Sequence, residues 1–125
     1  MEYNESCNSL EDLECWRACT EVRSFISELS NKYPKEEKYA LIDDMERAAS
    51  STTSYIAEGF GRFQFQESMQ FCQVSQGLLF ELIDQLITSM HNGYITSEEY
   101  EKGRSLISKA LPLLDGYIDY LACQR

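Results

Sequence analysis

Few side chains in this sequence combine the types and the spacing that metal binding requires. The five cysteines occupy positions 7, 15, 19, 72 and 123, no two of them form a C-x-x-C pair, and His91 is the single histidine. A structural zinc site needs about four such ligands, and an odd number of cysteines does not predict a disulfide framework. Cys15 and Cys19 would share one side of a helix, so a soft-metal site there is the alternative. We expect reduced, mostly buried thiols, with no metal and no cofactor.

The carboxylates are numerous, but their pattern does not predict catalysis. No histidine is paired with a nucleophile in a recognisable motif, and the Glu-x-x-His motif of di-iron bundles does not occur. Acidic clusters lie at Asp43, Asp44 and Glu46 and at Glu81 and Asp84, and carboxylates suit magnesium or calcium ions. Because no shaped loop accompanies these clusters, they predict a solvated acidic face. We therefore expect a protein without enzymatic activity.

The most specific segment is residues 47–62, in which a run of small side chains ends at two glycines that flank Phe60. Such a flank allows another helix to approach closely. Gly59 and Gly61 are expected to end the second helix, one of them in the left-handed conformation. A phosphate-binding loop places its glycines before a helix, with Lys or Arg nearby, so this pattern does not predict one.

Three charged residues of this segment, Arg47, Glu58 and Arg62, lie along one helical stripe, and the last two are spaced i,i+4. One interpretation is a polar interaction groove in which Glu58 anchors a partner, such as the backbone amides of a neighbouring subunit. The alternative is an ordinary surface ion pair, worth about 0.3 kcal/mol. We name these three residues as the candidate interaction groove.

The charge balance limits the classes of partner. Twenty-one acidic residues oppose eleven basic ones, a formal net charge of −10, and no Lys or Arg lies between Phe63 and Glu101. Proteins that bind nucleic acid gain affinity by neutralising phosphates, so this charge disfavours that class. A solvated acidic surface is the simplest interpretation, and attraction to a basic protein partner is the alternative.

Composition predicts one folded domain. Hydrophobic residues make up 43% of the chain, a share typical of globular proteins. No stretch approaches the roughly 18 consecutive apolar residues of a membrane span, and residues 1–6 lack the basic and apolar regions of a secretion signal. We expect a cytoplasmic protein with no membrane association, a flexible tail at residues 1–8, and a domain at residues 9–125.

Apolar periodicity and capping signals predict four helices joined by short connections. Capping boxes are expected at Ser9 with Asp12 and at Thr96 with Glu99, and Gly93 suits the left-handed position after a helix end. The first helix is expected to end near Ser30, the second to run from about Glu36 to Gly59 or Gly61, the third to run from about Glu67 to His91, and the fourth to begin after Thr96 and bend at Pro112. Similar lengths and short loops predict an all-α fold, an antiparallel up-down-up-down four-helix bundle.

The third helix is apolar on more of its surface than a bundle interior requires. Its apolar side chains form two stripes that together cover about two-thirds of the circumference, whereas a surface helix of a monomer needs only about 100°. One stripe can face the core, and the other needs another cover. Self-association would supply it, and we name Leu79, Ile83, Ile87 and Met90 as the candidate oligomer interface. The alternative is a central helix wrapped by its three neighbours.

Several motifs occur together in an order that resembles a known family. They are Leu13 with Trp16, Pro34-Lys35-x-Glu37-x-Tyr39, Arg47-Ala48-Ala49, Ile56-Ala57-Glu58-Gly59-Phe60-Gly61-Arg62 and Gly77-x-x-x-Glu81-Leu82. Over about residues 10–122 the chain resembles the small bacterial four-helix bundle proteins that are encoded by intervening sequences in 23S ribosomal RNA genes. The accessory variability determinants of diversity-generating retroelements look like relatives.

The resemblance implies an antiparallel bundle that assembles into a homopentamer and has no established enzymatic activity. For the retroelement relatives it implies a basic surface that binds RNA and a reverse transcriptase. This chain departs from the family pattern at Glu46 and Gln76, positions that are usually basic in the family. We therefore expect a self-assembling scaffold or adaptor for a protein partner, with an accessory RNA-binding protein as the alternative.

Overall fold

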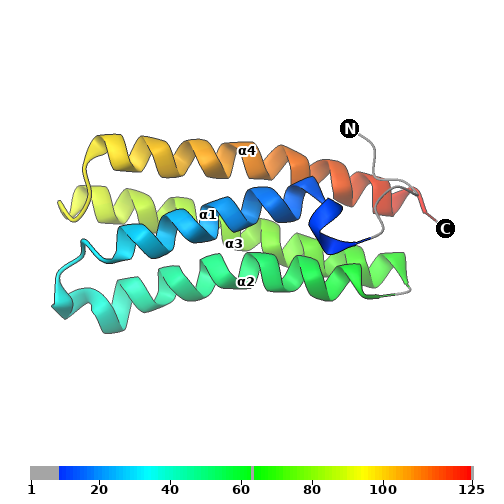
Figure 1. Cartoon of the computed structure of the whole chain (residues 1–125), viewed down its shortest axis with the longest axis horizontal. Coiled ribbons are helices and arrows are strands. Elements are labelled where there is room, and N and C mark those ends of the chain that lie inside the picture. The colour runs from blue at the N-terminus through cyan, green and yellow to red at the C-terminus, as the bar shows by residue number, and fades with distance from the viewer. Residues whose placement is uncertain (1–8, 63, 125) are drawn as a thin grey trace.

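The structure, a computed structural model, describes residues 9–62 and 64–124, apart from the side chains of residues 37–39. These residues form four long helices and no strand (Figure 1). The helices are α1 at Glu14–Ser30, α2 at Asp43–Phe60, α3 at Phe65–His91 and α4 at Ser97–Ala122. The predicted all-α four-helix bundle is confirmed. The tail predicted at residues 1–8, which includes Cys7, lies outside the described residues.

Neighbouring helices run in opposite directions. Between α2 and α3, Ser68 Oγ donates a hydrogen bond to the Gly59 carbonyl, and Ser75 Oγ donates one to the Thr52 carbonyl. Residue numbers therefore rise along one helix as they fall along the other. In Figure 1 the connections from α1 to α2 and from α3 to α4 lie at one end of the bundle, and the connection from α2 to α3 lies at the other. This is the up-down-up-down order of a bundle with short loops.

The helix ends follow local signals in the sequence. At α4, the Glu99 N–H donates to Thr96 Oγ1 at 3.0 Å and the Thr96 N–H donates to Glu99 Oε1 at 2.8 Å, so the predicted capping box is confirmed. Gly93, just after α3, has a φ of 78°, the left-handed conformation predicted for it. Near the start of the chain, the Asp12 carboxylate accepts a hydrogen bond from the Ser9 N–H at 3.1 Å and caps a short 3-10 turn, Leu10–Asp12, ahead of α1.

The start of the second helix differs from the prediction. Instead of one α-helix from about Glu36, the chain forms a 3-10 turn at Lys35–Glu37 and a π-helical turn at Lys38–Ile42 before α2 begins at Asp43. Pro34 disfavours helix in the residue before it and so separates these turns from α1. With this geometry Ile42 is buried while Asp43 is exposed.

The glycines at the end of α2 also differ from the prediction. The helix ends at Phe60, as expected, but Gly61 caps it with a φ of −80°, and Gly93 is the glycine with positive φ among the described residues. The expected left-handed glycine is therefore wrong. Gly59 lies inside the helix and is buried. It is needed for close packing and not for a turn, as the candidate site shows.

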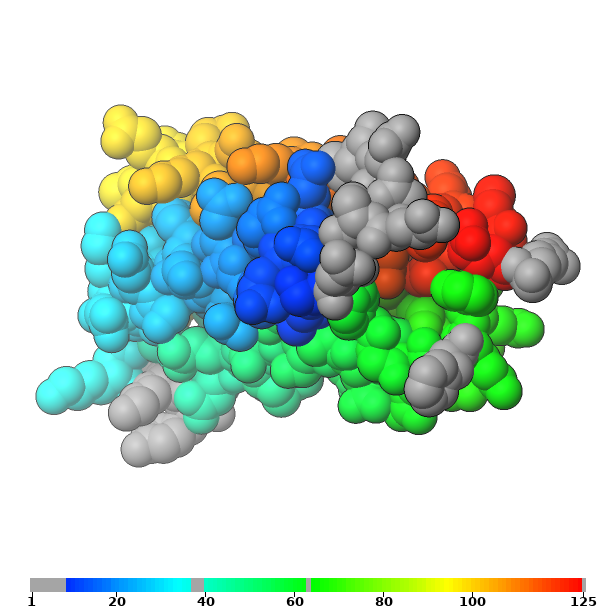
Figure 2. Space-filling view, turned by 45° about the vertical axis from the view of Figure 1, so that its right-hand side comes forward, coloured from blue at the N-terminus to red at the C-terminus, as the bar shows by residue number. Residues whose placement is uncertain are grey.

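The core runs along the bundle axis and is filled by apolar side chains from all four helices. In Figure 2, α1 covers one face of it, between α4 above and α2 below. The largest fully buried side chains include Leu13, Ile26, Met45, Ile56, Leu79, Leu82, Leu86, Ile107 and Leu114. Helix α4 continues through Pro112, whose side chain is exposed.

Three of the cysteines belong to this core. Cys15, Cys19 and Cys72 are buried, whereas Cys123 is exposed. Burial in apolar surroundings raises the pKa of Cys19 to about 11 and that of Cys72 to about 12, and it raises the pKa of Cys15 further. These thiols are therefore neutral and behave as small apolar side chains.

Candidate functional site

Helices α2 and α3 approach closely where the end of α2 crosses the start of α3. A Cβ on Gly59 would lie 2.9 Å from the Ser68 carbonyl oxygen and 3.2 Å from Phe71 Cβ. Ser68 Oγ is buried and donates a hydrogen bond of 2.6 Å to the Gly59 carbonyl. The small residues of α2 therefore serve the close helix contact that residues 47–62 predict.

On the exposed side of this crossing, Arg62 interacts with neighbouring side chains of both α2 and α3. Its guanidinium donates to Glu58 Oε2 at 2.6 Å, lies 3.9 Å from Glu67 Oε2, and stands 5.1 Å from the centroid of the Phe71 ring. Glu58 and Arg62 thus form the predicted i,i+4 pair, and both are substantially exposed. An exposed pair of this kind contributes about 0.2–1 kcal/mol to stability.

Arg47 is separated from that pair. It lies 11 residues before Glu58, which corresponds to about 16 Å along a helix, and its nearest acid is Asp44 at 3.9 Å. The structure therefore brings together two of the three candidate groove residues. A shallow hollow of about 510 Å³ lies beside that pair and is lined by Ser54, Ala57, Glu58, Gly61 and Arg62. Its role as an interaction groove stays a prediction.

Aromatic and apolar side chains extend this surface along the seam between α2 and α3. The Tyr55 ring stacks on the Phe71 ring with centroids 6.0 Å apart and an interplanar angle of 24°. Tyr55 is 37% exposed, and Val74, one turn further along α3, is 45% exposed. Arg62 and Tyr55 therefore both contact Phe71.

The four residues of the candidate oligomer interface divide between core and surface. Leu79 is fully buried in the bundle, so it is not available to a second copy. Ile83, Ile87 and Met90 are half-buried, packing against the core with part of each side chain at the surface. Phe80, which is 60% exposed, is the most exposed large apolar side chain among the described residues. On the same side of α3, Gln76 donates a hydrogen bond to Asp115 of α4, so we call Phe80, Ile83, Ile87 and Met90 the α3–α4 face.

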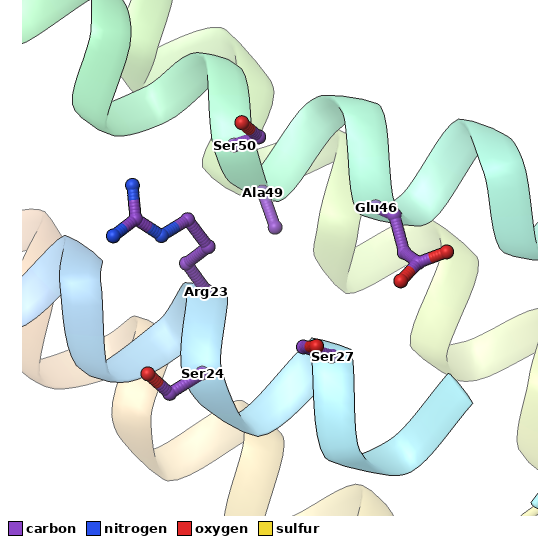
Figure 3. Close-up of a pocket in the computed structure, with 6 residues that line it drawn as sticks. All are labelled: Arg23, Ser24, Ser27, Glu46, Ala49 and Ser50. Atoms are coloured by element: carbon purple, nitrogen blue, oxygen red, sulfur yellow. The ribbon is translucent and has the colours of Figure 1, made fainter. Parts of the chain in front are cut away.

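A second hollow, of about 380 Å³, lies between α1 and α2. It is lined by Arg23, Ser24 and Ser27 of α1 and by Glu46, Ala49 and Ser50 of α2 (Figure 3). Arg23 donates a hydrogen bond of 2.9 Å to Thr53 Oγ1, and Glu46 accepts one of 3.3 Å from Ser30 Oγ. Both charged side chains therefore have partners within the chain.

The remaining candidate features are the metal-binding side chains, the acidic clusters and the possible membrane-spanning helices. No three His, Cys, Asp or Glu side chains in residues 9–62 and 64–124 are placed to hold a metal ion. Asp43, Asp44 and Glu46 lie in the exposed first turn of α2, and Glu81 and Asp84 lie on the exposed side of α3. None of the helices in this part of the chain is both long and apolar enough to cross a membrane.

These features define a class of protein, a small antiparallel four-helix bundle whose most exposed apolar side chains gather on α3. Residues 11–116 match the family described as 23S rRNA-intervening sequence protein, and the chain belongs to this family. The resemblance that the motifs indicate is thereby confirmed. A comparison with curated proteins finds no match.

Proposed function

We propose that this protein is a non-enzymatic, self-assembling four-helix bundle that serves as a scaffold or adaptor for a protein partner. The observation that carries the proposal is the exposure of Phe80, at 60%, beside half-buried Ile83 and Ile87 on one side of α3. Removing apolar surface from water contributes about 25 cal/mol per square ångström to an association, from which the entropy cost of association is subtracted. A second copy that covers this face would gain that free energy.

Charge supports a protein partner over RNA. The chain carries a net charge of −10, and the resemblance implies that Glu46 and Gln76 occupy positions that are usually basic in the family. Phosphate binding requires clustered cations. The accessory RNA-binding role is therefore the second candidate, supported by the family's link to ribosomal RNA genes.

Sedimentation velocity of the full chain over a dilution series tests the self-assembly. We expect a defined oligomer for the wild type and a smaller species for the double variant Ile83→Gln/Ile87→Gln, with helical circular dichroism retained. Phe65→Gln changes another exposed aromatic side chain of α3, outside the α3–α4 face, and is the matched control. A wild-type protein that sediments as a folded single chain at every concentration would contradict the proposal.

The RNA alternative has its own test. Phosphate contacts predict an affinity that falls steeply as salt is added. Filter binding of labelled ribosomal RNA fragments at low salt is expected to show no complex. A salt-sensitive complex would favour the RNA-binding role instead.

A further inference from the structure

Gly77 lies in the middle of α3 without a packing reason inside its own chain. A Cβ placed on Gly77 would meet no atom within 4 Å, whereas one on Gly59 or Gly103 would approach a neighbour to 2.9 Å. Glycine within a helix is less favourable than alanine, because it loses more backbone freedom on folding. No close contact within the described residues therefore requires a glycine at position 77.

The residues around Gly77 make this position a notch on the outward side of α3. Val74 lies three residues before it and is 45% exposed, and Glu81 lies four residues after it and is exposed. The spacing i−3, i and i+4 places all three on one face of the helix. We call Val74, Gly77 and Glu81 the α3 notch. Because Gly77 has no side chain, an element that packs against it can bring its own backbone closer to α3 than it could at any other residue type.

Charge indicates what kind of element fits. Neither Glu81 nor neighbouring Asp84 forms an ion pair within residues 9–62 and 64–124, and the sequence has no Lys or Arg from Phe63 to Glu101. A segment that covers the notch must therefore bring its own cations to neutralise these carboxylates. Like charges placed against them would cost free energy.

A second copy of this chain is poorly suited to that role. Each copy carries a net charge of −10, and two notches face to face would oppose carboxylate to carboxylate. Most of the described basic side chains already have partners in their own chain. The engaged side chains are Arg17, Arg23, Lys32, Arg47, Arg62, Lys102, Arg104 and Lys109.

We infer that the α3 notch docks a cationic amphipathic helix of another protein. The apolar residues of that helix would pack on Val74 and against Gly77. Its Lys or Arg side chains would pair with Glu81 and Asp84. Amphipathic helices commonly bind in this way, with apolar anchors one and two turns apart. The inference rests on the adaptor role proposed above and names the class of its partner.

Binding of a synthetic helical peptide to the full chain tests the inference. The probe is a fluorescent peptide that repeats leucine and lysine at helical spacing, and its controls replace every lysine by glutamate or scramble the order. We expect salt-sensitive binding of the lysine peptide alone. The variant Gly77→Gln fills the notch and favours helix, so it is expected to fold and to lose at least about tenfold in affinity.

The charge variants have a matched control on other helices. Glu81→Gln/Asp84→Asn is expected to weaken binding and flatten its salt dependence. Glu28→Gln/Asp119→Asn removes the same charges from exposed positions of α1 and α4 and is expected to leave binding unchanged. No binding by the wild type, or an equal loss in both double variants, would overturn the inference.

Sedimentation of the same variants separates this inference from the self-assembly. If Gly77→Gln changes the oligomer mass, the notch is a contact between copies and the inference is wrong. If the wild type is a single chain yet Gly77→Gln still abolishes peptide binding, the inference stands and the proposed self-assembly fails.

Discussion

Ser68 and Gly59 hold α2 and α3 together through one contact that is both steric and polar. The Ser68 hydroxyl donates to the Gly59 carbonyl at 2.6 Å, and the Ser68 carbonyl oxygen lies 2.9 Å from where a Gly59 Cβ would be. The hydrogen bond is possible because neither residue has a large side chain. The same crossing places Arg62 and Phe71 beside each other at the surface.

Gly59→Ala is expected to lower the free energy of unfolding by about 1–3 kcal/mol, because the new methyl group forces backbone apart. Gly61→Ala is the matched control, since a Cβ there meets nothing closer than 3.8 Å and φ is −80°. Urea denaturation followed by circular dichroism measures both. Equal midpoints for the two variants would contradict the steric account.

The conformation at the end of α3 and the start of α4 is predictable from the sequence. Which side of a helix is buried, and against which neighbour, is not. Gly93 and the pair Thr96 and Glu99 act within a few residues, so their patterns predict their conformations correctly. Gly59 could either end a helix or allow close helix packing, and only the position of α3 decides between these two roles. The apolar stripes of α3 likewise do not show which side chains are most deeply buried, so the sequence predicts Leu79 at an interface although it belongs to the core.

The α3 notch is not predictable from the sequence alone. A glycine inside a helix is either required for close packing or present without a packing requirement. The distinction depends on which atoms surround it. The prediction of the Glu58–Arg62 pair succeeded because i,i+4 spacing is a property of the helix itself. Arg47 shares their stripe but lies too far along the axis to join them.

Gln85→Met is expected to stabilise the protein by about 1 kcal/mol. Gln85 is 9% exposed, and its Oε1 is buried without a hydrogen-bond partner, a state that costs about 1–3 kcal/mol. Gln73→Met makes the same chemical change at an exposed position of α3 and is expected to be nearly neutral. Thermal unfolding compares them. A lower midpoint for Gln85→Met would show that the amide oxygen has a partner in solution.

The buried thiols predict a loss of stability at alkaline pH. In the unfolded chain a thiol ionises near 9.0, whereas burial raises the pKa of Cys72 to about 12, a shift increased by neighbouring Cys19. Above pH 9.0 the unfolded state binds fewer protons than the folded state, so the free energy of unfolding falls with rising pH.

Cys72→Ala isolates this effect. Its stability is expected to fall less steeply above pH 9.0, by about 1.4 kcal/mol per pH unit for the thiol removed. Cys123→Ala, which removes an exposed thiol, is the matched control. Urea titrations at several pH values measure the slopes, and parallel slopes for wild type and Cys72→Ala would refute the assignment.

Glu99 predicts a loss of stability at acid pH. The Lys32 ammonium group, followed by the Thr96 N–H, lowers the pKa of the Glu99 carboxyl from 4.5. The stabilisation is therefore complete above pH 4.5 and is lost as the pH falls through the lower folded value. Glu99→Gln is expected to cost about 1 kcal/mol at neutral pH and to reduce the acid sensitivity. Glu98→Gln, in the same turn, is the control for charge alone.

No Lys or Arg lies between Arg62 and Lys102 in the sequence, and the whole of α3 falls within this interval. Trypsin must therefore release this helix as one uncut peptide, and amine-reactive cross-linkers have no attachment point along it. Proximity mapping of either proposed contact depends on reagents that label carboxylates or that are activated by light.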